Sequence, residues 1–222
     1  MEKMIVCGFI STMLFLSSCV SFNIEKVKPS EKIVKEEYQM KPFNEVELNV
    51  MGNVKIVQSE TDDYRVVLSA PENYIEFYKF SVDGHELNGD ILHSGNLDVE
   101  DVNITIYTPM LHSLENEGLS TIIIDSLQTK SLAIENSGVG TMKLYGLNVD
   151  KFAVECSGVG SIDAENLKAR RVQGDVSGVG GIKCYATDTL KATVSGVGSF
   201  KYAGSPRVKK LNDSGVGSIS EL

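Results

Sequence analysis

The tetrapeptide SGVG occurs five times between residues 137 and 217, and its spacing constrains the fold more than any other feature. The serines of the five copies are at positions 137, 157, 177, 195 and 214, so successive copies are 20, 20, 18 and 19 residues apart. Self-similarity at such a period predicts a solenoid, in which each repeat is one turn that packs only on its neighbours.

Apolar and polar residues alternate on both sides of each tetrad. Leu132 and Ile134 lie five and three residues before the first serine, whereas Glu135 lies two before it, and the later copies follow the same pattern. A period of two is typical of strands with one buried face, and no segment between the tetrads is long enough for a helix. The sequence therefore predicts an all-β, single-domain parallel β-helix with rungs of about 20 residues.

The tetrads are expected to form the corners of this solenoid. Equivalent corners stack about 4.8 Å apart, and glycine lets neighbouring backbones approach closely, while the serines can form a hydroxyl ladder and the valines an apolar column. A phosphate loop would continue into a helix, and a calcium nonapeptide would carry an aspartate after the glycines; neither occurs here. The predicted structural corner residues are Ser137, Gly138, Gly140, Ser157, Gly158, Gly160, Ser177, Gly178, Gly180, Ser195, Gly196, Gly198, Ser214, Gly215 and Gly217.

The first half of the chain shows a looser version of the same pattern. The segment ENEGLSTIII at residues 115–124 aligns with ENSGVGTMKL, and VMGNVKIVQ at residues 50–58 resembles a corner followed by a strand. Alternating runs at residues 65–69, 80–82 and 102–107 suggest further turns. In total we expect about nine rungs, which would make a stack of about 40 Å.

The N-terminus has the pattern of a bacterial lipoprotein signal peptide. A short apolar run at residues 5–16 leads into LSSC, and such a run is too short to span a bilayer. Residues 1–18 are therefore predicted to be the signal peptide and Cys19 the lipidated residue; a plain secretory signal is the alternative. Because Val20 and Ser21 follow the cysteine, with no aspartate, the outer membrane is favoured over the inner membrane.

Residues 19–42 are expected to be the lipidated N-terminus and a tether, with a short helix near residues 31–38 as an option. The β-helix domain would then occupy residues 43–222. The formal net charge of −9 gives no electrostatic footprint for nucleic acid, so the expected partners are the membrane, through the lipid anchor, and a ligand. Cys156 and Cys184 fall on inward positions and are expected to be buried free thiols, although a disulfide remains open.

Nothing in the sequence has the pattern of a catalytic or metal site. His85, His93 and His112 lack a paired metal-ligand spacing, and His85 in VDGHEL is best explained by a hairpin turn. We therefore predict no catalytic residues, no metal and no cofactor.

An acidic ladder is the one candidate ligand-facing cluster. Glu135, Glu155 and Asp175 lie two residues before successive serines and should stack about 4.8 Å apart on the outer face. Stacked carboxylates can bind a cation or act as an acid and base pair. They can equally form a solvated acidic face relieved by Lys143, Lys151 and Arg170.

Three segments together resemble a known bacterial family. They are FNEVELNVMGNVKIVQ, VNITIYTPMLHSLENEG and the recurrent SGVG, and the resemblance extends over residues 43–222. The chain resembles the domain of unknown function labelled putative autotransporter adhesin, head GIN domain. This resemblance implies a right-handed parallel β-helix of the kind common among lipoproteins and secreted proteins of the Bacteroidota, and it implies no defined catalytic residues.

The last tetrad is followed only by SISEL, so the final rung has no obvious cap. This end could self-associate, or Lys209, Lys210 and Asp213 could cap it by breaking the apolar pattern. Two function classes follow. The first is a non-enzymatic, lipid-anchored envelope protein that presents a rigid β-helix for binding or adhesion to a glycan, a matrix component or an envelope protein. The second is a carbohydrate-active lyase or hydrolase that uses the stacked carboxylates, and a bare scaffold for envelope assembly is a third option.

Overall fold

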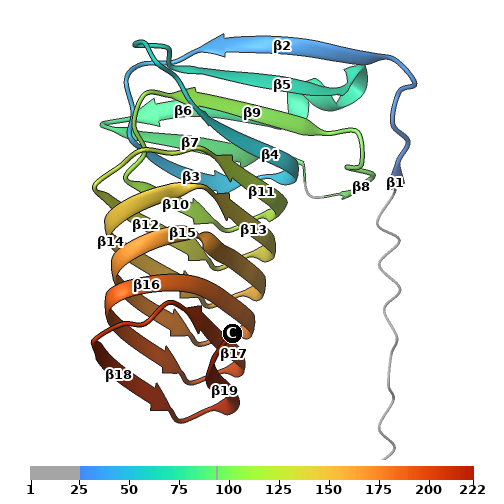
Figure 1. Ribbon diagram of the computed structural model, residues 1–222. Coiled ribbons are helices and arrows are strands. Elements are labelled where there is room, and N and C mark those ends of the chain that lie inside the picture. Colours follow the sequence, from blue (N-terminus) through green and yellow to red (C-terminus); the bar gives the residue numbers. More distant parts are fainter. Residues whose placement is uncertain (1–25, 94) are drawn as a thin grey trace, which may run out of the picture.

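Strands of successive repeats lie parallel and in register in the computed structural model, which describes residues 26–93 and 95–222 (Figure 1). The described chain is nearly all β, with 69% strand and 3% helix, and forms a β-solenoid with about 5 regular turns. The predicted signal peptide and Cys19 lie outside the described residues. The strands of the stack are β3 (Glu45–Asn49), β4 (Met51–Gln58), β10 (Ser113–Asn116), β11 (Leu119–Asp125), β12 (Ser131–Asn136), β13 (Val139–Tyr145), β14 (Leu147–Cys156), β15 (Val159–Val176), β16 (Val179–Val194), β17 (Val197–Ala203), β18 (Val208–Asp213) and β19 (Val216–Glu221).

The observed register is the one that the tetrad alignment predicts. Leu132 pairs with Phe152, which pairs with Val172, and Val172 pairs with Leu190. These side chains are buried, so the core consists of inward columns that run along the stack. The long strands β15 and β16 each run from one SGVG corner to the next. On the way they continue around the second corner of the turn, which has no glycine tetrad, so each strand joins two successive turns.

The end of the stack formed by β3 and β4 is covered by a cap of mostly antiparallel strands. Its elements are β1 (Lys26–Val27), β2 (Ile33–Gln39), β5 (Arg65–Pro71), the 3-10 helix η1 (Glu72–Phe77), β6 (Tyr78–Asp83), β7 (Glu86–Ile91), β8 (Asn96–Leu97) and β9 (Asn103–Thr108). Strand β5 pairs antiparallel with β2 and β9, and β6 pairs antiparallel with β7 around the turn that contains His85. The predicted hairpin at His85 is confirmed.

In the first half of the chain, the structure corrects one expectation, the number of rungs, and excludes one option, a short helix. The estimate of about nine rungs is too high because residues 65–69 and 80–82 form the antiparallel strands β5 and β6 rather than turns. The segment near residues 31–38 is not a helix, because β2 finds a pairing partner in β5. Alternation alone could not distinguish these cases, since parallel and antiparallel strands share the same period.

The first turn in the sequence is not the first turn in the stack. Strands β3 and β4 pair on one side with β7 and β9 and on the other side with β10 and β11. The chain therefore makes one turn, leaves it to build the cap, and returns to continue the stack from the opposite side of that turn (Figure 1).

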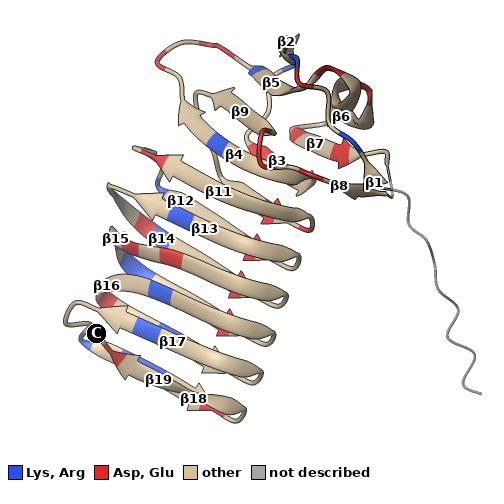
Figure 2. Ribbon diagram, turned by 90° about the vertical axis from the view of Figure 1, so that its right-hand side faces the viewer, with Lys and Arg blue, Asp and Glu red and all other residues tan. Residues whose placement is uncertain are grey.

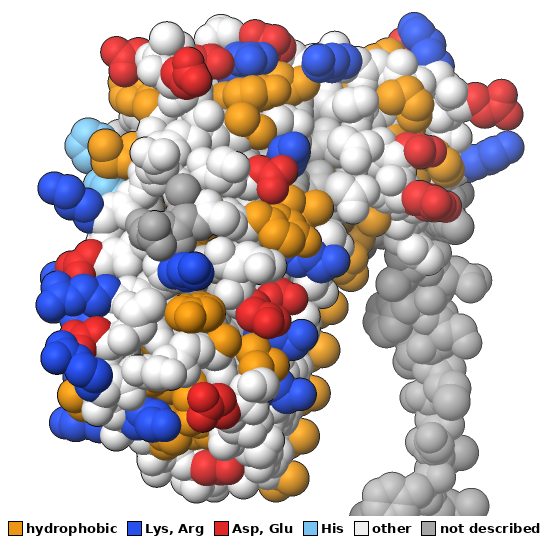
Figure 3. All heavy atoms as spheres, viewed as in Figure 1, with side chains coloured by type: hydrophobic (Ala, Val, Ile, Leu, Met, Phe, Trp, Pro, Cys, Tyr) orange, Lys and Arg blue, Asp and Glu red, His pale blue; other side chains and the backbone are white. Residues whose placement is uncertain are grey.

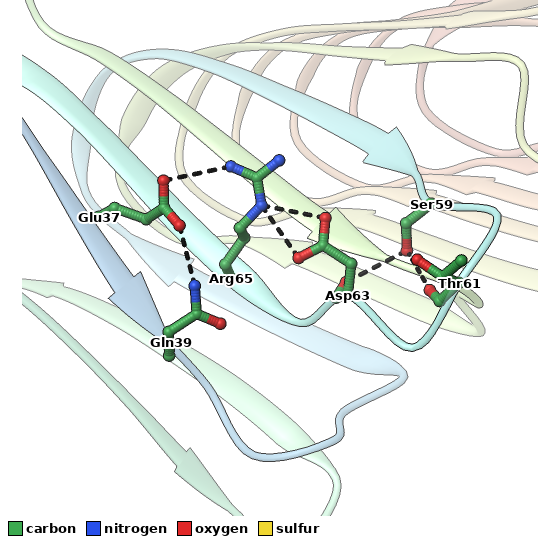
Figure 4. A network of polar contacts seen from close by, with 6 residues as sticks. All are labelled: Glu37, Gln39, Ser59, Thr61, Asp63 and Arg65. Atoms are coloured by element: carbon green, nitrogen blue, oxygen red, sulfur yellow. Dashed lines mark hydrogen bonds and ion pairs between the residues drawn. The ribbon is translucent and has the colours of Figure 1, made fainter.

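A polar network holds the strands of the cap together (Figure 4). The Arg65 Nε atom donates to Asp63 Oδ1 at 2.9 Å, and its Nη1 atom lies 3.4 Å from Glu37 Oε2. The Arg65 guanidinium also lies 3.8 Å from the centroid of the Tyr107 ring, and Gln39 donates to Glu37. One arginine thus joins β2, β5, β9 and the loop between β4 and β5.

The core contains a short buried polar column beside the corners. Ser120 Oγ donates to Asn116 Oδ1 at 2.6 Å, and Asn116 Nδ2 donates to Asn136 Oδ1 at 2.7 Å. Cys156 follows Asn136 in the same column, and both Cys156 and Cys184 are buried and free, as predicted. Burial raises the pKa of Cys184 to about 12, so this thiol stays protonated at neutral pH.

Candidate functional site

The SGVG corners are held by backbone contacts from turn to turn. Ser157 N and Gly158 N both donate to the carbonyl oxygen of Asn136, at 3.1 and 3.0 Å, and Val159 N donates to that of Gly138 at 2.9 Å. The same pattern recurs at each later corner. Within the described residues, no hydrogen bond joins one corner serine hydroxyl to the next, so the backbone forms the ladder that the serines were expected to form.

The valines of the corners form an exposed apolar ridge. They pair in register from Val139 to Val216, and the side chains of the ridge are between 47% and 77% exposed. Figure 3 shows this line of hydrophobic side chains along the edge of the solenoid. We call it the corner ridge, and its members are Leu119, Val139, Val159, Val179, Val197 and Val216.

The corner ridge carries no charge over its whole length. Each ridge valine stands between two glycines, and a serine precedes the first of them. Charged residues lie to either side of the corner, on the two strands that meet there (Figure 2). An uncharged strip on a chain with a net charge of −9 is therefore set apart from the rest of the surface.

The predicted acidic ladder is present, and it is longer than predicted. Glu135 pairs with Glu155, and Glu155 with Asp175, on the outer face of the strands that precede the corners. Glu115 and Glu47 continue the ladder toward the cap, because β10 pairs with both β12 and β3. The alignment of ENEG with ENSG could have predicted that Glu115 belongs to the ladder. The position of Glu47 in the ladder could not be predicted in this way, because it depends on the pairing of β3 with β10.

Stacking changes the protonation of the ladder. Desolvation raises the pKa of Glu135 above its usual range, and the neighbouring carboxylate of Glu155 raises it further. The pKa of Glu115 is raised by desolvation and by the carboxylate of Glu135. The pKa of Glu47 is raised by desolvation and by the carboxylate of Glu117. These carboxylates therefore hold protons more tightly than isolated ones.

Small side chains and bases lie beside the ladder. Ala133 and Ala153 form the next outward column, and Lys151 and Arg171 form the column beyond it. The alanines leave an open depression of about 400 Å³ against the ladder and one of about 330 Å³ against the bases. We call this three-column surface the charged face.

The three bases expected to relieve the ladder are distributed differently. Lys143 lies on β13, beyond the corner, and Arg170 pairs with Asp150 at 3.5 Å. Lys151 lies on the same strand as Glu155, but neither forms an ion pair with any residue that the structure describes. The ladder therefore faces solvent without a partner inside the described chain.

The described residues contain no group of three or more His, Cys, Asp or Glu side chains that could hold a metal ion. His85 lies in the cap hairpin, and His93 stacks on Phe77 with ring centroids 4.5 Å apart. The carboxylates of the ladder are thus not joined by any histidine into a catalytic constellation within residues 26–93 and 95–222. Over the same residues, no helix has the length and apolar character needed to cross a bilayer.

These features define a capped parallel β-solenoid with two distinct outer surfaces, the uncharged corner ridge and the charged face, on which Arg171 binds Asp150. The chain belongs to the family described as putative auto-transporter adhesin, head GIN domain, whose model matches residues 42–206. This confirms the resemblance found in the sequence.

A putative adhesin from Bacteroides fragilis has a solved structure that is 31% identical in sequence and covers 88% of this chain and 100% of its own, with a TM-score of 0.75. A putative adhesin from Parabacteroides merdae is 19% identical, covers 89% of this chain and 99% of its own, and has a TM-score of 0.58. A putative lipid binding protein from Parabacteroides distasonis is 19% identical, covers 89% and 100%, and has a TM-score of 0.54. The last two likenesses show the fold alone. No curated protein matches the chain.

Proposed function

We propose that this protein is a non-enzymatic, lipid-anchored protein of the cell envelope that presents its solenoid for binding or adhesion. Membership of a family described as adhesins and the likeness to the Bacteroides fragilis adhesin support this function. The signal-peptide pattern that ends at Cys19 supports the anchor, and the absence of aspartate after the cysteine favours the outer membrane.

The corner ridge is the observation that carries the proposal. Apolar surface that runs without a break over many turns is typical of interaction sites, whereas scattered apolar residues need no explanation. The corner geometry requires glycines but does not require valine, because the valine side chain points to solvent. An uncharged ridge with hydroxyls beside it suits an uncharged partner surface, on a glycan, a matrix component or another envelope protein.

Binding of the chain from Val20 onward to an array of glycans and matrix proteins tests this function. We expect saturable binding that the double variant Val159→Lys, Val179→Lys abolishes, because two charges would interrupt the ridge. Val208→Lys is the matched control, since Val208 is 48% exposed but lies off the ridge. Binding that survives the double variant would exclude the ridge as the contact surface.

The alternative function is a carbohydrate-active enzyme, favoured by the depression beside the stacked carboxylates. The same array, assayed for released sugar product, separates the two functions. Product that appears with the wild type and disappears with Glu135→Gln, Glu155→Gln would establish the enzyme and overturn the proposal.

The anchor has its own test. Cells that express the full chain are labelled with a clickable fatty acid and separated into membrane fractions. We expect label on the wild type in the outer-membrane fraction and none on Cys19→Ala. Equal labelling of the two would show that Cys19 is not the lipidated residue.

A further inference from the structure

The charged face carries a pattern that is complementary to itself. Its three outward columns run along the stack. The column nearest the corner holds Glu135, Glu155 and Asp175, the middle column holds Ala133, Ala153, Gln173 and Lys191, and the farthest column holds the bases Lys151 and Arg171 between Ser131 and Thr189. Glu155 and Lys151 occupy the outer columns of one strand, and Asp175 and Arg171 occupy those of the next. Each of these two turns therefore presents one acid and one base on either side of a small or neutral residue.

We propose that two copies of this chain pair through the charged face, side by side and with their caps at the same end. A twofold axis parallel to the stack and over the middle column places the acidic column of each copy opposite the basic column of the other. Lys151 then faces Glu155 of the second copy. Arg171, which also binds Asp150 of its own chain, faces Asp175 of the second copy, and symmetry repeats both pairs.

The pattern also excludes the reverse arrangement. A twofold axis perpendicular to the stack, in the plane of the face, would place the acidic column against the acidic column and Lys151 close to bases of the other copy. Like charges in contact are strongly unfavourable in an interface. The charges therefore select the parallel pair over the antiparallel one.

The middle column permits close approach of the two faces. Ala133 and Ala153 lie on the axis, and packed sheets with small side chains come within about 10 Å of each other. Lys191 follows in the same column and would lie near its own copy, but its long side chain can reach Asp175 of the second copy one turn away.

The size of the face predicts a weak dimer. About six strands, spaced about 4.8 Å apart, make the face about 30 Å long, and five residues of about 3.3 Å each make it about 17 Å wide. The two copies together would therefore bury about 1,000 Å² of surface, which is the lower limit for a specific interface. Copies lipid-anchored on one membrane, as proposed above, would meet at high effective concentration, and only the parallel pair places both caps, in which β1 lies, at the same end. The two corner ridges stay exposed on opposite edges of such a pair.

Cysteine crosslinking of the full chain in intact cells tests the pair, with a short bismaleimide that spans packed sheets. In the parallel pair Ser113→Cys and Lys191→Cys each crosslink to their own copies, because each lies on the axis. In the antiparallel pair neither variant crosslinks alone, and only cells that express both give a mixed dimer. Thr141→Cys, beyond the corner on β13, and the wild type with its native cysteines are the controls.

A charge exchange separates specific pairing from crowding. We expect Lys151→Glu, Arg171→Glu in the Ser113→Cys chain to lower the crosslinked fraction about tenfold, and Glu155→Lys, Asp175→Lys to do the same. Co-expression of the two reversed chains should restore the crosslink, since acids again face bases. Three results would each overturn the proposal. They are a crosslinked fraction that the charge-reversed variants leave unchanged, crosslinks only in cells that express both Ser113→Cys and Lys191→Cys, and no crosslinks above the Thr141→Cys control.

Discussion

A β-carbon built on Gly158 would lie 2.1 Å from the carbonyl oxygen of Gly138 in the preceding corner. The same relationship recurs at Gly178 and Gly196, whose β-carbons would meet Gly158 and Gly178 at 2.1 and 2.2 Å. The neighbour is backbone that is itself hydrogen-bonded, so it cannot move aside as a flexible side chain can. The first glycine of the tetrad is therefore required by the stacking of corners.

We expect Gly158→Ala to lower the free energy of unfolding by about 3 kcal/mol, because overpacking here must separate two hydrogen-bonded corners. Gly181→Ala is the matched control. Its β-carbon would lie 3.1 Å from Ser199 O, and the equivalent positions of neighbouring turns hold Thr141, Ser161 and Ser199. Urea unfolding followed by circular dichroism measures both. Equal stability of Gly158→Ala and the wild type would contradict the corner account.

The Phe200 ring occupies the space below Gly174. A β-carbon on Gly174 would lie 2.1 Å from Phe200 Cε2, and the preceding residue in the column is Val154. We expect Phe200→Ala to destabilise the fold by about 4 kcal/mol and Gly174→Val to destabilise it through the clash. The double variant should lose at least about 1 kcal/mol less than the sum, since valine fills the space that the ring leaves. Strict additivity in a double-mutant cycle would rule out this coupling.

The acidic ladder should make stability depend on pH. The pKa of Glu135 is raised in the folded state by desolvation and by Glu155, so folding favours the protonated form. Its contribution is therefore most favourable below the unfolded pKa and is lost as pH rises through the folded pKa. We expect Glu135→Gln to stabilise the protein at pH 7 by about 0.5 kcal/mol, the size of a cross-strand charge pair.

That gain should vanish at about pH 4, below the raised pKa of Glu135, where the Glu135 carboxyl is protonated and uncharged. Denaturation at both pH values, with Glu165→Gln as a control for an exposed carboxylate away from the ladder, makes the comparison. A gain that persists unchanged in acid would show that repulsion within the ladder is not its cause.

The last rung carries charges on positions that are apolar in earlier turns. Lys209 pairs with Leu190 and Asp213 with Val194, so both occupy core columns, and Lys209 Nζ lies 5.6 Å from the Tyr202 ring centroid. Inward-pointing charges on an edge strand discourage another strand from pairing there. We therefore expect this rung to end the stack rather than to self-associate.

Replacing these charges should open that end. The double variant Lys209→Leu, Asp213→Val should associate end to end at concentrations where the wild type does not, as measured by sedimentation velocity. Lys210→Leu, Asn212→Val is the matched control, because the same number of polar groups is removed from the outer face of β18. End-to-end association of the wild type itself would show that the charges do not protect the rung.

The sequence predicted the repeating part of the fold in detail, because each turn depends only on its neighbours. A period of two and a tetrad at fixed spacing were enough to pair Leu132 with Phe152 and Glu135 with Glu155 in the correct register. The cap could not be predicted in this way. The antiparallel pairing of β2 with β5 joins strands whose alternation is the same as that of the parallel turns, and nothing local marks their direction.

The candidate surfaces were predicted only in part. The valine column followed from the tetrads, but its exposure depended on which way the corner directs the side chain. The charged face was missed because Lys151 lies four residues from Glu155, and only the register of several turns shows that bases form a column of their own. The signal-peptide and Cys19 predictions lie outside the described residues.

The position of the β3–β4 turn between β7–β9 and β10–β11 has a consequence for how the protein forms. A ribosome makes this turn first, yet both of its neighbours in the stack are made later. The early turn must stay unpaired until the cap strands return, whereas every later turn can add to an existing edge as soon as it emerges. The slow step of folding should therefore be the closure of the cap around the first turn, and the tetrad repeats should follow it quickly.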